Sequence, residues 1–208
     1  MRVATFYDLP GNSLRKSTFV LADTDPGAAG SYIEAMTGTH GLEPELNPVL
    51  AQIESKTGPN NFLRVMAQRP EAMESFVRFY DSLMGSGSLL DPRLKEMVYL
   101  AVSFVNEASY CGSRHTIAAH DAGLSEDEIS AIELENNQHF SAREQAALHY
   151  AREVTRTASV DDDTRYRAQE LFSDPEFIEL TLIVALANFT NRFSNALAVS
   201  PHAARSMG

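Results

Sequence analysis

Signals for the start of a helix recur along this chain and constrain its fold more than any other feature. Three Ser-x-x-Glu capping boxes lie in its second half: Ser125 with Glu128, Ser141 with Glu144, and Ser173 with Glu176. In such a box, the two side chains satisfy backbone N–H groups that a helix start leaves without partners. Asp91 before Pro92 marks a further start, because aspartate is a favourable N-cap and proline suits the first helical position. These signals predict an all-helical body.

Apolar residues recur at helical spacing between these signals and extend the pattern over most of the chain. They predict about nine helices joined by short loops: residues 45–58, 60–68, 71–85, 93–106, 110–123, 124–133, 143–156, 162–172 and 175–199. Gly58 and Gly123 suit the position just after a helix end. Ser109 and Asp161 are expected to cap the helices that begin after them. The predicted fold class is therefore all-α, and the apolar last helix should lie centrally or in a subunit interface.

Residues 1–40 lack the helical pattern. Two short strand-like pieces, VATFY and STFVLA, flank Pro10 and Gly11, and Pro26-Gly27 breaks the chain again after the second piece. A chain of 208 residues is long enough for one domain with a hydrophobic core and an additional arm. We therefore expect an irregular N-terminal arm at residues 1–40 and one all-helical domain at residues 41–208.

The charge of the chain argues against some classes of partner. The formal net charge is −11, and the basic residues are scattered. A nucleic-acid surface or an anionic membrane surface needs clustered cations, so neither partner is expected. No apolar run has the length of a signal peptide or a membrane span. A single cysteine cannot form an internal disulfide and fits a reducing compartment, with the cytoplasm as the expected location.

That cysteine lies in the stretch NEASYCGSRHTIAAH, residues 106–120, and points most directly to chemistry. Cys111 precedes His115 by four residues, which places both side chains on one face of a helix. A free thiol is only about 3% thiolate at pH 7, and a position in the first turn of a helix changes this by less than about 1 kcal/mol. His115 could accept the thiol proton if a carboxylate oriented its other ring nitrogen. Glu96, on the preceding helix, is the candidate carboxylate.

The same residues also have structural interpretations. Cys111 could be a small buried hydrophobe, and His115 a solvated surface residue. Glu96 follows Lys95 and could belong to a charged outer face. His120 points elsewhere on the helix and is expected to be structural, and Tyr110 to be a packing residue. Asn188 and Arg192, one turn apart in an apolar helix, indicate a structural polar network or an interface, because buried polar groups need partners.

The stretch from Glu96 to Gly123 resembles the signature of the alkylhydroperoxidase D and carboxymuconolactone decarboxylase superfamily. Redox-active members carry a glutamate, a Cys-x-x-Cys pair, and a histidine four residues after the second cysteine. Glu96, Cys111 and His115 stand at the corresponding places. The segments GPNNFLRVMAQRPEAMESFVRFYDSLMG, SAREQAALHYAREVT and NFTNRFSNAL resemble the longer, peroxidase-related members. The resemblance covers roughly residues 43–200 and leaves the expected arm outside.

The resemblance implies an alkylhydroperoxidase D-like helical bundle that forms trimers or hexamers, with no metal and no organic cofactor. It implies that Cys111, His115 and Glu96 are catalytic. Ala108 departs from the pattern, because it stands where the motif has its first cysteine. A dithiol cycle within one subunit is therefore impossible, and a sulfenic acid formed on Cys111 would need an external thiol reductant.

Three functions remain open from the sequence. The chain could be a peroxidase-type oxidoreductase, an antioxidant enzyme that reduces a small-molecule peroxide with a single cysteine. It could instead use Glu96 and His115 as an acid–base pair in a decarboxylase or lyase reaction. It could also be a non-catalytic oligomeric protein that lost the dithiol cycle together with the first cysteine.

Overall fold

The structure, a computed structural model, describes residues 3–8, 15–20 and 48–199. The described residues after 47 form nine α-helices and one short 3₁₀ turn, η2. The bounds are α2 (Pro48–Thr57), α3 (Asn61–Met66), α4 (Pro70–Met84), α5 (Pro92–Val105), α6 (Ser109–Asp121), α7 (Glu126–Glu133), η2 (Asn137–His139), α8 (Ala142–Thr157), α9 (Asp162–Leu171) and α10 (Asp174–Ala196). The predicted all-α class is confirmed.

The described strands form one small hairpin at the N-terminus. Strand β1 (Val3–Asp8) pairs antiparallel with β2 (Arg15–Val20), and Val3 lies opposite Val20. These strands overlap the two strand-like pieces that the sequence predicts. The rest of the expected arm, and the expected boundary between residues 40 and 41, lie outside the described residues.

The predicted helix starts form with the expected side-chain contacts. The glutamate of each capping box accepts a hydrogen bond from the backbone N–H of its serine, at 2.9 Å in all three boxes. The Asp91 carboxylate accepts from the Leu94 N–H at 2.9 Å, and the Asp161 carboxylate accepts from the Thr164 N–H at 2.7 Å. Local sequence therefore sets these helix starts, because each side chain satisfies a backbone donor that would otherwise lack a partner.

The expected cap at Ser109 is wrong by one residue. The Ala108 carbonyl already accepts the first helical hydrogen bond, from the Gly112 N–H at 2.8 Å, so Ser109 is the first residue of α6. Alanine has no side-chain acceptor, and α6 starts without a side-chain cap. The Ala108 N–H instead donates to the Ser103 carbonyl at 2.9 Å, which ties the start of α6 to the end of α5. Cys111 keeps the first-turn position that the sequence indicated.

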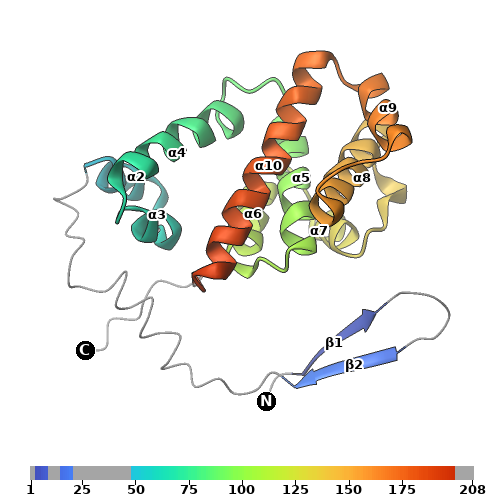
Figure 1. Ribbon diagram of the computed structural model, residues 1–208, viewed down its shortest axis with the longest axis horizontal. Coiled ribbons are helices and arrows are strands. Elements are labelled where there is room, and N and C mark those ends of the chain that lie inside the picture. Colours follow the sequence, from blue (N-terminus) through green and yellow to red (C-terminus); the bar gives the residue numbers. More distant parts are fainter. Residues whose placement is uncertain (1–2, 9–14, 21–47, 200–208) are drawn as a thin grey trace.

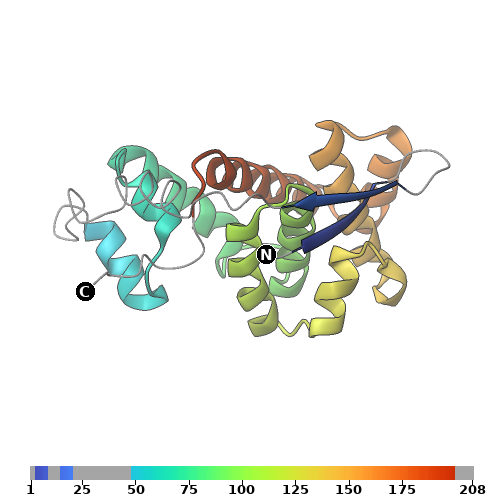
Figure 2. The same ribbon diagram turned by 90° about the horizontal axis from the view of Figure 1, so that it is seen from below.

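Helix α5 lies at the centre of the helical body (Figure 1) and contacts α6, α7, α8 and α10. The view turned by 90° shows α2, α3 and α4 grouped on one side, with α6 to α9 towards the other (Figure 2). Helix α10 joins the two groups, since it contacts α4 as well as α5, α6, α8 and α9. None of the described helices has both the length and the apolar character needed to cross a bilayer.

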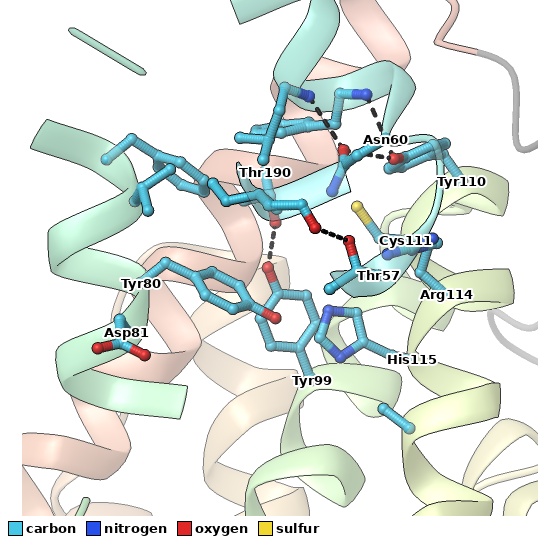
Figure 3. Close-up of a pocket in the computed structure, with 16 residues that line it drawn as sticks. Thr57, Asn60, Tyr80, Asp81, Tyr99, Tyr110, Cys111, Arg114, His115 and Thr190 are labelled. Atoms are coloured by element: carbon cyan, nitrogen blue, oxygen red, sulfur yellow. Dashed lines mark hydrogen bonds between the residues drawn. The ribbon is translucent and has the colours of Figure 1, made fainter. Parts of the chain in front are cut away.

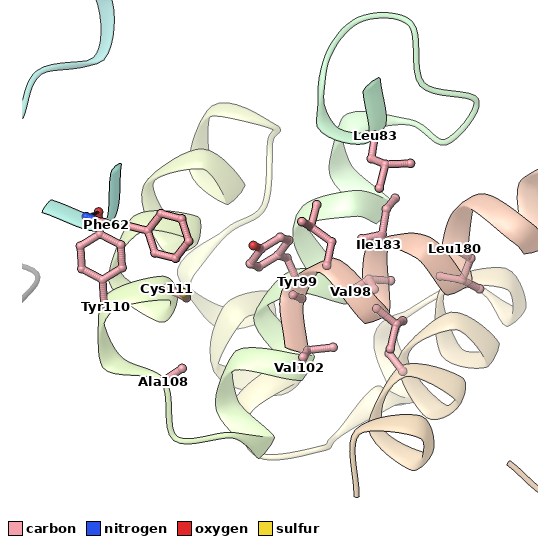
Figure 4. Packing of buried hydrophobic residues seen from close by; sticks show 14 of the residues in the cluster. Phe62, Leu83, Val98, Tyr99, Val102, Ala108, Tyr110, Cys111, Leu180 and Ile183 are labelled. Carbon is pink, nitrogen blue, oxygen red and sulfur yellow. Dashed lines mark hydrogen bonds between the residues drawn. The ribbon is translucent and has the colours of Figure 1, made fainter. Parts of the chain in front are cut away.

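Residues on opposite faces of α5 belong to two different hydrophobic clusters. In the larger cluster, Val98, Tyr99 and Val102 of α5 pack with Leu180 and Ile183 of α10 (Figure 4). The smaller cluster joins the other faces of α5 to α6, α7 and α8. Complete burial of one such aliphatic side chain stabilises the fold by roughly 1.5–3 kcal/mol. Helix α5 is therefore a rigid support for the polar residues along its length.

A network of asparagines fixes the tight turn between α5 and α6 to α10. The Asn106 side chain donates to the Asn188 and Asn191 side-chain oxygens, at 3.0 and 3.1 Å. The Asn195 side chain donates to the Asn106 carbonyl at 2.9 Å. Arg192 hydrogen-bonds to Asn188, so these two residues belong to a polar network, one of the two interpretations that the sequence left open. This network fixes where α6 begins, and hence where Cys111 lies.

Candidate active site

A cavity of about 380 Å³ lies between the α2–α4 group, the α5–α6 pair and α10. Cys111 and His115 both line it, as do three tyrosines and two phenylalanines: Tyr80, Tyr99, Tyr110, Phe62 and Phe76. Figure 3 shows Cys111, Arg114 and His115 extending from α6 on one side and Tyr80 from α4 on the other. The cavity therefore combines a thiol and an imidazole with a largely aromatic wall.

The Cys111 sulfur lies at the base of α6, where the side chain is only 4% exposed. Its Sγ is 3.6 Å from the Ser194 hydroxyl, a hydrogen bond to α10. The Ser194 hydroxyl donates to the Thr190 carbonyl at 2.8 Å. Because that bond uses the only hydroxyl proton of Ser194, the Cys111 thiol is the donor to Ser194 Oγ. If the thiol ionises, Ser194 can turn its proton towards the sulfur instead.

The predicted pairing of His115 with Glu96 is present. His115 Nδ1 is 2.6 Å from Glu96 Oε2, and both side chains are largely buried. An ionised carboxylate only accepts hydrogen bonds, so Nδ1 carries a proton and Nε2 is left as the basic nitrogen of the neutral ring. The interpretation of Glu96 as part of an outer charged face is wrong. Even its neighbour Lys95 is buried, and Lys95 Nζ donates to the Met84 and Gly85 carbonyls at 3.1 Å.

The Tyr99 ring packs against one face of the His115 imidazole. The Tyr99 and His115 rings are stacked, and the Tyr99 hydroxyl is 2.6 Å from the Thr190 hydroxyl. Burial is the main cause that raises the pKa of Tyr99 far above its ordinary value, so its ring remains a neutral surface for His115. His115 therefore has a fixed orientation before any substrate binds.

Arg114 is a residue of the site that sequence reasoning missed. It lines the cavity, and none of the described residues forms an ion pair or a hydrogen bond with its guanidinium. From the sequence, only His115 was expected to supply positive charge near the thiol. Arg114 lies three residues after Cys111, a spacing that also places two side chains on one helix face. That spacing was the available signal, and the site has two basic side chains rather than one.

Tyr110 does more than pack at the start of α6. Its hydroxyl donates to Asn60 Oδ1 at 3.0 Å and accepts the Phe62 N–H at 3.2 Å, so it ties α6 to the start of α3. Burial is the main cause that raises the pKa of Tyr110. His120 is structural as expected, since its Nδ1 lies 3.0 Å from the Leu124 carbonyl. Among the described residues, no group of three or more His, Cys, Asp or Glu side chains is placed to hold a metal ion.

The chain is similar to one known family and to several solved structures. Residues 70–153 match the carboxymuconolactone decarboxylase family, a range that includes Glu96, Cys111 and His115. This match supports the resemblance to the alkylhydroperoxidase D and carboxymuconolactone decarboxylase superfamily that the sequence indicates. The uncharacterized protein YdfG of Bacillus subtilis (strain 168) is 29% identical to it over 113 residues, which cover 53% of this chain and 77% of YdfG.

Solved structures of other proteins have the same fold. An uncharacterized peroxidase-related protein from Silicibacter sp. TM1040 superposes with a TM-score of 0.71 at 24% identity, covering 79% of this chain and 88% of that one. An uncharacterized peroxidase-related protein from Ralstonia eutropha JMP134, described as an alkylhydroperoxidase AhpD core, gives 0.67 at 21% identity, covering 77% and 87%. Helices α2, α3 and α10, which help to line the cavity, lie outside the range that the family matches.

Proposed function

We propose that the chain reduces an organic hydroperoxide, with Cys111 as the nucleophile, His115 as the base and Glu96 as the residue that orients His115. The observation that carries this proposal is the shared cavity: it contains the Cys111 thiol and an imidazole whose Nδ1 is bound by Glu96 at 2.6 Å. Arg114 supports it, because a cation without an ion-pair partner in the described structure lines the same cavity on the same helix face as the thiol.

The reaction proceeds by transfer of two electrons from sulfur to the peroxide. His115 Nε2 accepts the Cys111 proton, and the thiolate attacks the oxygen of the hydroperoxide that carries the hydrogen. The O–O bond breaks, the OH group stays on sulfur as a sulfenic acid, and the alkoxide takes the proton back from His115. The products are a sulfenic acid on Cys111 and an alcohol.

An external thiol completes the cycle in this proposal. Ala108 supplies no second sulfur, so a thiol from outside attacks the sulfenic acid, releasing water and forming a mixed disulfide. A second equivalent of thiol then frees Cys111. Because the sulfur is buried beside a cavity of about 380 Å³, a small-molecule thiol reaches it more readily than a thiol on a folded protein. Such a cycle suits the reducing conditions of the cytoplasm.

The test is oxidation of the purified protein by a stoichiometric amount of cumene hydroperoxide. Cys111 is the only cysteine, so thiol titration reports it alone. We expect rapid loss of the thiol, with a sulfenic acid trapped by dimedone and identified by mass spectrometry. His115→Ala should slow the reaction, whereas His120→Ala, a change of the same kind later in α6, should not. A wild-type thiol that reacts no faster than free cysteine would exclude the proposal.

The acid–base alternative has an observation of its own in favour. The Glu96–His115 pair is complete without the thiol, since its hydrogen bond does not involve Cys111. A decarboxylase or lyase that uses this pair would keep its activity in Cys111→Ser and lose it in His115→Ala. The proposed peroxide reduction would be lost in Cys111→Ser and slowed in His115→Ala, and a non-catalytic protein would show neither activity.

A further inference from the structure

The three tyrosines of the cavity differ in what their hydroxyl groups contact. The Tyr99 hydroxyl pairs with Thr190 at 2.6 Å, and the Tyr110 hydroxyl bridges Asn60 and Phe62. The hydroxyl of Tyr80 forms no hydrogen bond with any of the described residues, although Tyr80 lines the same cavity. Of the three, Tyr80 alone has a phenolic proton available for a bound molecule.

The position of Tyr80 directs this proton towards the reacting groups. Its ring packs against Phe76, one turn earlier on α4, with ring centroids 5.8 Å apart. Figure 3 shows the ring extending from α4 into the cavity, with its hydroxyl end towards Tyr99 and His115. Cys111 lies on the opposite wall, on α6. A molecule bound in the cavity therefore has the thiol on one side and the Tyr80 hydroxyl on the other.

The Tyr80 phenol remains protonated when Cys111 is present as a thiolate. Burial raises the pKa of Tyr80 well above its ordinary value of 10, and the negative charges of Glu96 and of an ionised Cys111 raise it further. Arg114 acts in the opposite direction but does not reverse the shift. A neutral phenol can donate a hydrogen bond to an oxygen that becomes negative, whereas a phenolate could not.

We propose that Tyr80 donates a hydrogen bond to the leaving oxygen of the organic hydroperoxide, which departs as an alkoxide. This inference rests on the proposed peroxide reduction. The thiolate forms its bond to the peroxide oxygen that carries the hydrogen, and the O–O bond breaks. Negative charge then develops on the other peroxide oxygen, which is bonded to carbon. Tyr80 stabilises that charge, and the proton removed from Cys111 returns from His115 to complete the alcohol.

The size and lining of the cavity support an organic substrate over hydrogen peroxide. A volume of about 380 Å³ corresponds to roughly a dozen water molecules at about 30 Å³ each. Hydrogen peroxide, with two heavy atoms, would leave most of this space to water. The rings of Phe62, Phe76 and Tyr110 offer an apolar surface to the carbon part of a larger hydroperoxide.

The dependence on the leaving group tests this role of Tyr80. An alcohol is about as weak an acid as water, so its alkoxide gains much from a hydrogen-bond donor. A carboxylate leaving group, with a pKa of about 4 for its acid, gains little. We expect Tyr80→Phe to slow oxidation of Cys111 by cumene hydroperoxide at least about 10-fold, by analogy with the loss of one oxyanion donor. Oxidation by peracetic acid, and alkylation by iodoacetamide, should change by less than about 2-fold.

A matched control removes a tyrosine hydroxyl elsewhere. Tyr150 is a buried tyrosine whose hydroxyl pairs with Thr181 outside the cavity, so Tyr150→Phe should leave all three rates unchanged. If Tyr80→Phe slows the three reactions equally, Tyr80 only shapes the site. If the substitution slows none of them, Tyr80 has no role in the reaction. Either result overturns the inference. Both results leave the proposed function standing. A wild-type Cys111 that neither peroxide oxidises faster than free cysteine would overturn the proposed function and this inference together.

Discussion

The imidazole of His115 lies flat on the ring of Tyr99, with ring centroids 3.5 Å apart and ring planes inclined by 14°. The Tyr99 side chain is itself almost completely buried and is bound to Thr190 of α10. Glu96 fixes the edge of the same imidazole at 2.6 Å. The histidine is thus held on its face and on its edge by two residues of α5, one turn apart. An imidazole held in this way would lose little on adopting the orientation that the proposed base requires.

We predict that Glu96→Gln lowers the rate of peroxide-dependent oxidation of Cys111 by about 10- to 100-fold. This is the range found when a residue that orients a metal-binding histidine is removed. The amide can hold the ring, but it carries no negative charge to stabilise the imidazolium that forms. Thiol titration after rapid mixing measures the rate.

Glu126→Gln provides the control for this prediction. Glu126 also forms an ion pair with a histidine, His120, at 3.1 Å, but on the exposed surface. Its removal should leave the rate unchanged. Equal rates in wild type and Glu96→Gln would show that the Glu96–His115 hydrogen bond has no part in activating the thiol.

Ala108→Cys should create a dithiol that closes under mild oxidation. Ala108 is the N-cap of α6 and Cys111 lies in its first turn, so the two side chains are three residues apart. This spacing puts Cβ atoms about 5–6 Å apart in a regular helix, somewhat beyond the roughly 3.5–4.5 Å of a disulfide. Residue 108 precedes the regular helix and can adjust, as residues at a helix start do in Cys-x-x-Cys motifs.

The measurement is the loss of two thiols with a mass decrease of two hydrogens and no dimer formation. Ser113→Cys is the control, because Ser113 lies two residues after Cys111 and faces away from it on α6. That variant should form no internal disulfide. If Ala108→Cys behaves like Ser113→Cys, the chain does not keep the register of the dithiol motif.

Local signals made most of the fold predictable. The helix starts depend on side chains that bond to backbone groups only a few residues away, so the capping boxes could be read from the sequence. The Glu96–His115 contact was predictable because a tight turn must bring consecutive helices side by side. The error at Ser109 concerns a helix start without any side-chain cap, where only the backbone hydrogen bond to Ala108 marks the boundary.

The missing parts of the site depend on packing between distant segments. Tyr80 comes from α4, and no spacing rule connects it with Cys111 on α6. Arg114 has helical spacing to Cys111, but spacing does not tell which face of α6 borders a cavity. Ser194 of α10 contacts the sulfur only because the asparagine network holds α10 against the start of α6. These residues become visible only when the helices are placed in space.

The acid stability of the fold should depend on Glu128. The Arg93 guanidinium, at 2.6 Å, and then the Ser125 N–H lower the pKa of Glu128 from its ordinary 4.5 to about 2. A carboxylate whose pKa is lower in the folded state contributes stability above its ordinary pKa and loses it as the pH falls towards the folded value. Glu128→Gln should therefore lower the free energy of unfolding by about 1 kcal/mol at pH 7, the upper range for a partly exposed ion pair.

Urea unfolding of both proteins between pH 7 and pH 2 measures this difference, which should shrink below about pH 4.5 and nearly vanish near pH 2. Glu133→Gln is the control, since Glu133 lies on the same helix and forms no ion pair among the described residues. A difference between wild type and Glu128→Gln that stays constant down to pH 2 would contradict the role of the Glu128 charge.

Finally, we predict that the chain is a homo-oligomer that uses one face of α10. Ile178, Leu182 and Phe189 are 60%, 38% and 50% exposed, and their spacing of four and seven residues places them along one side of the helix. A row of exposed apolar side chains on a soluble protein marks an interaction surface. A charge in the middle of this row would have to be buried without a partner if the same face lies in a subunit interface.

Leu182→Glu should therefore shift the protein towards the monomer by at least about 10-fold in dissociation constant, equivalent to about 1.4 kcal/mol. Light scattering on dilution through the micromolar range measures the mass. Leu134→Glu is the matched control, because Leu134 is also exposed, at 77%, but follows α7 rather than lying on α10. A wild-type protein that is monomeric at tens of micromolar would refute the prediction. An oligomer that tolerates Leu182→Glu as well as Leu134→Glu would place the interface on another face.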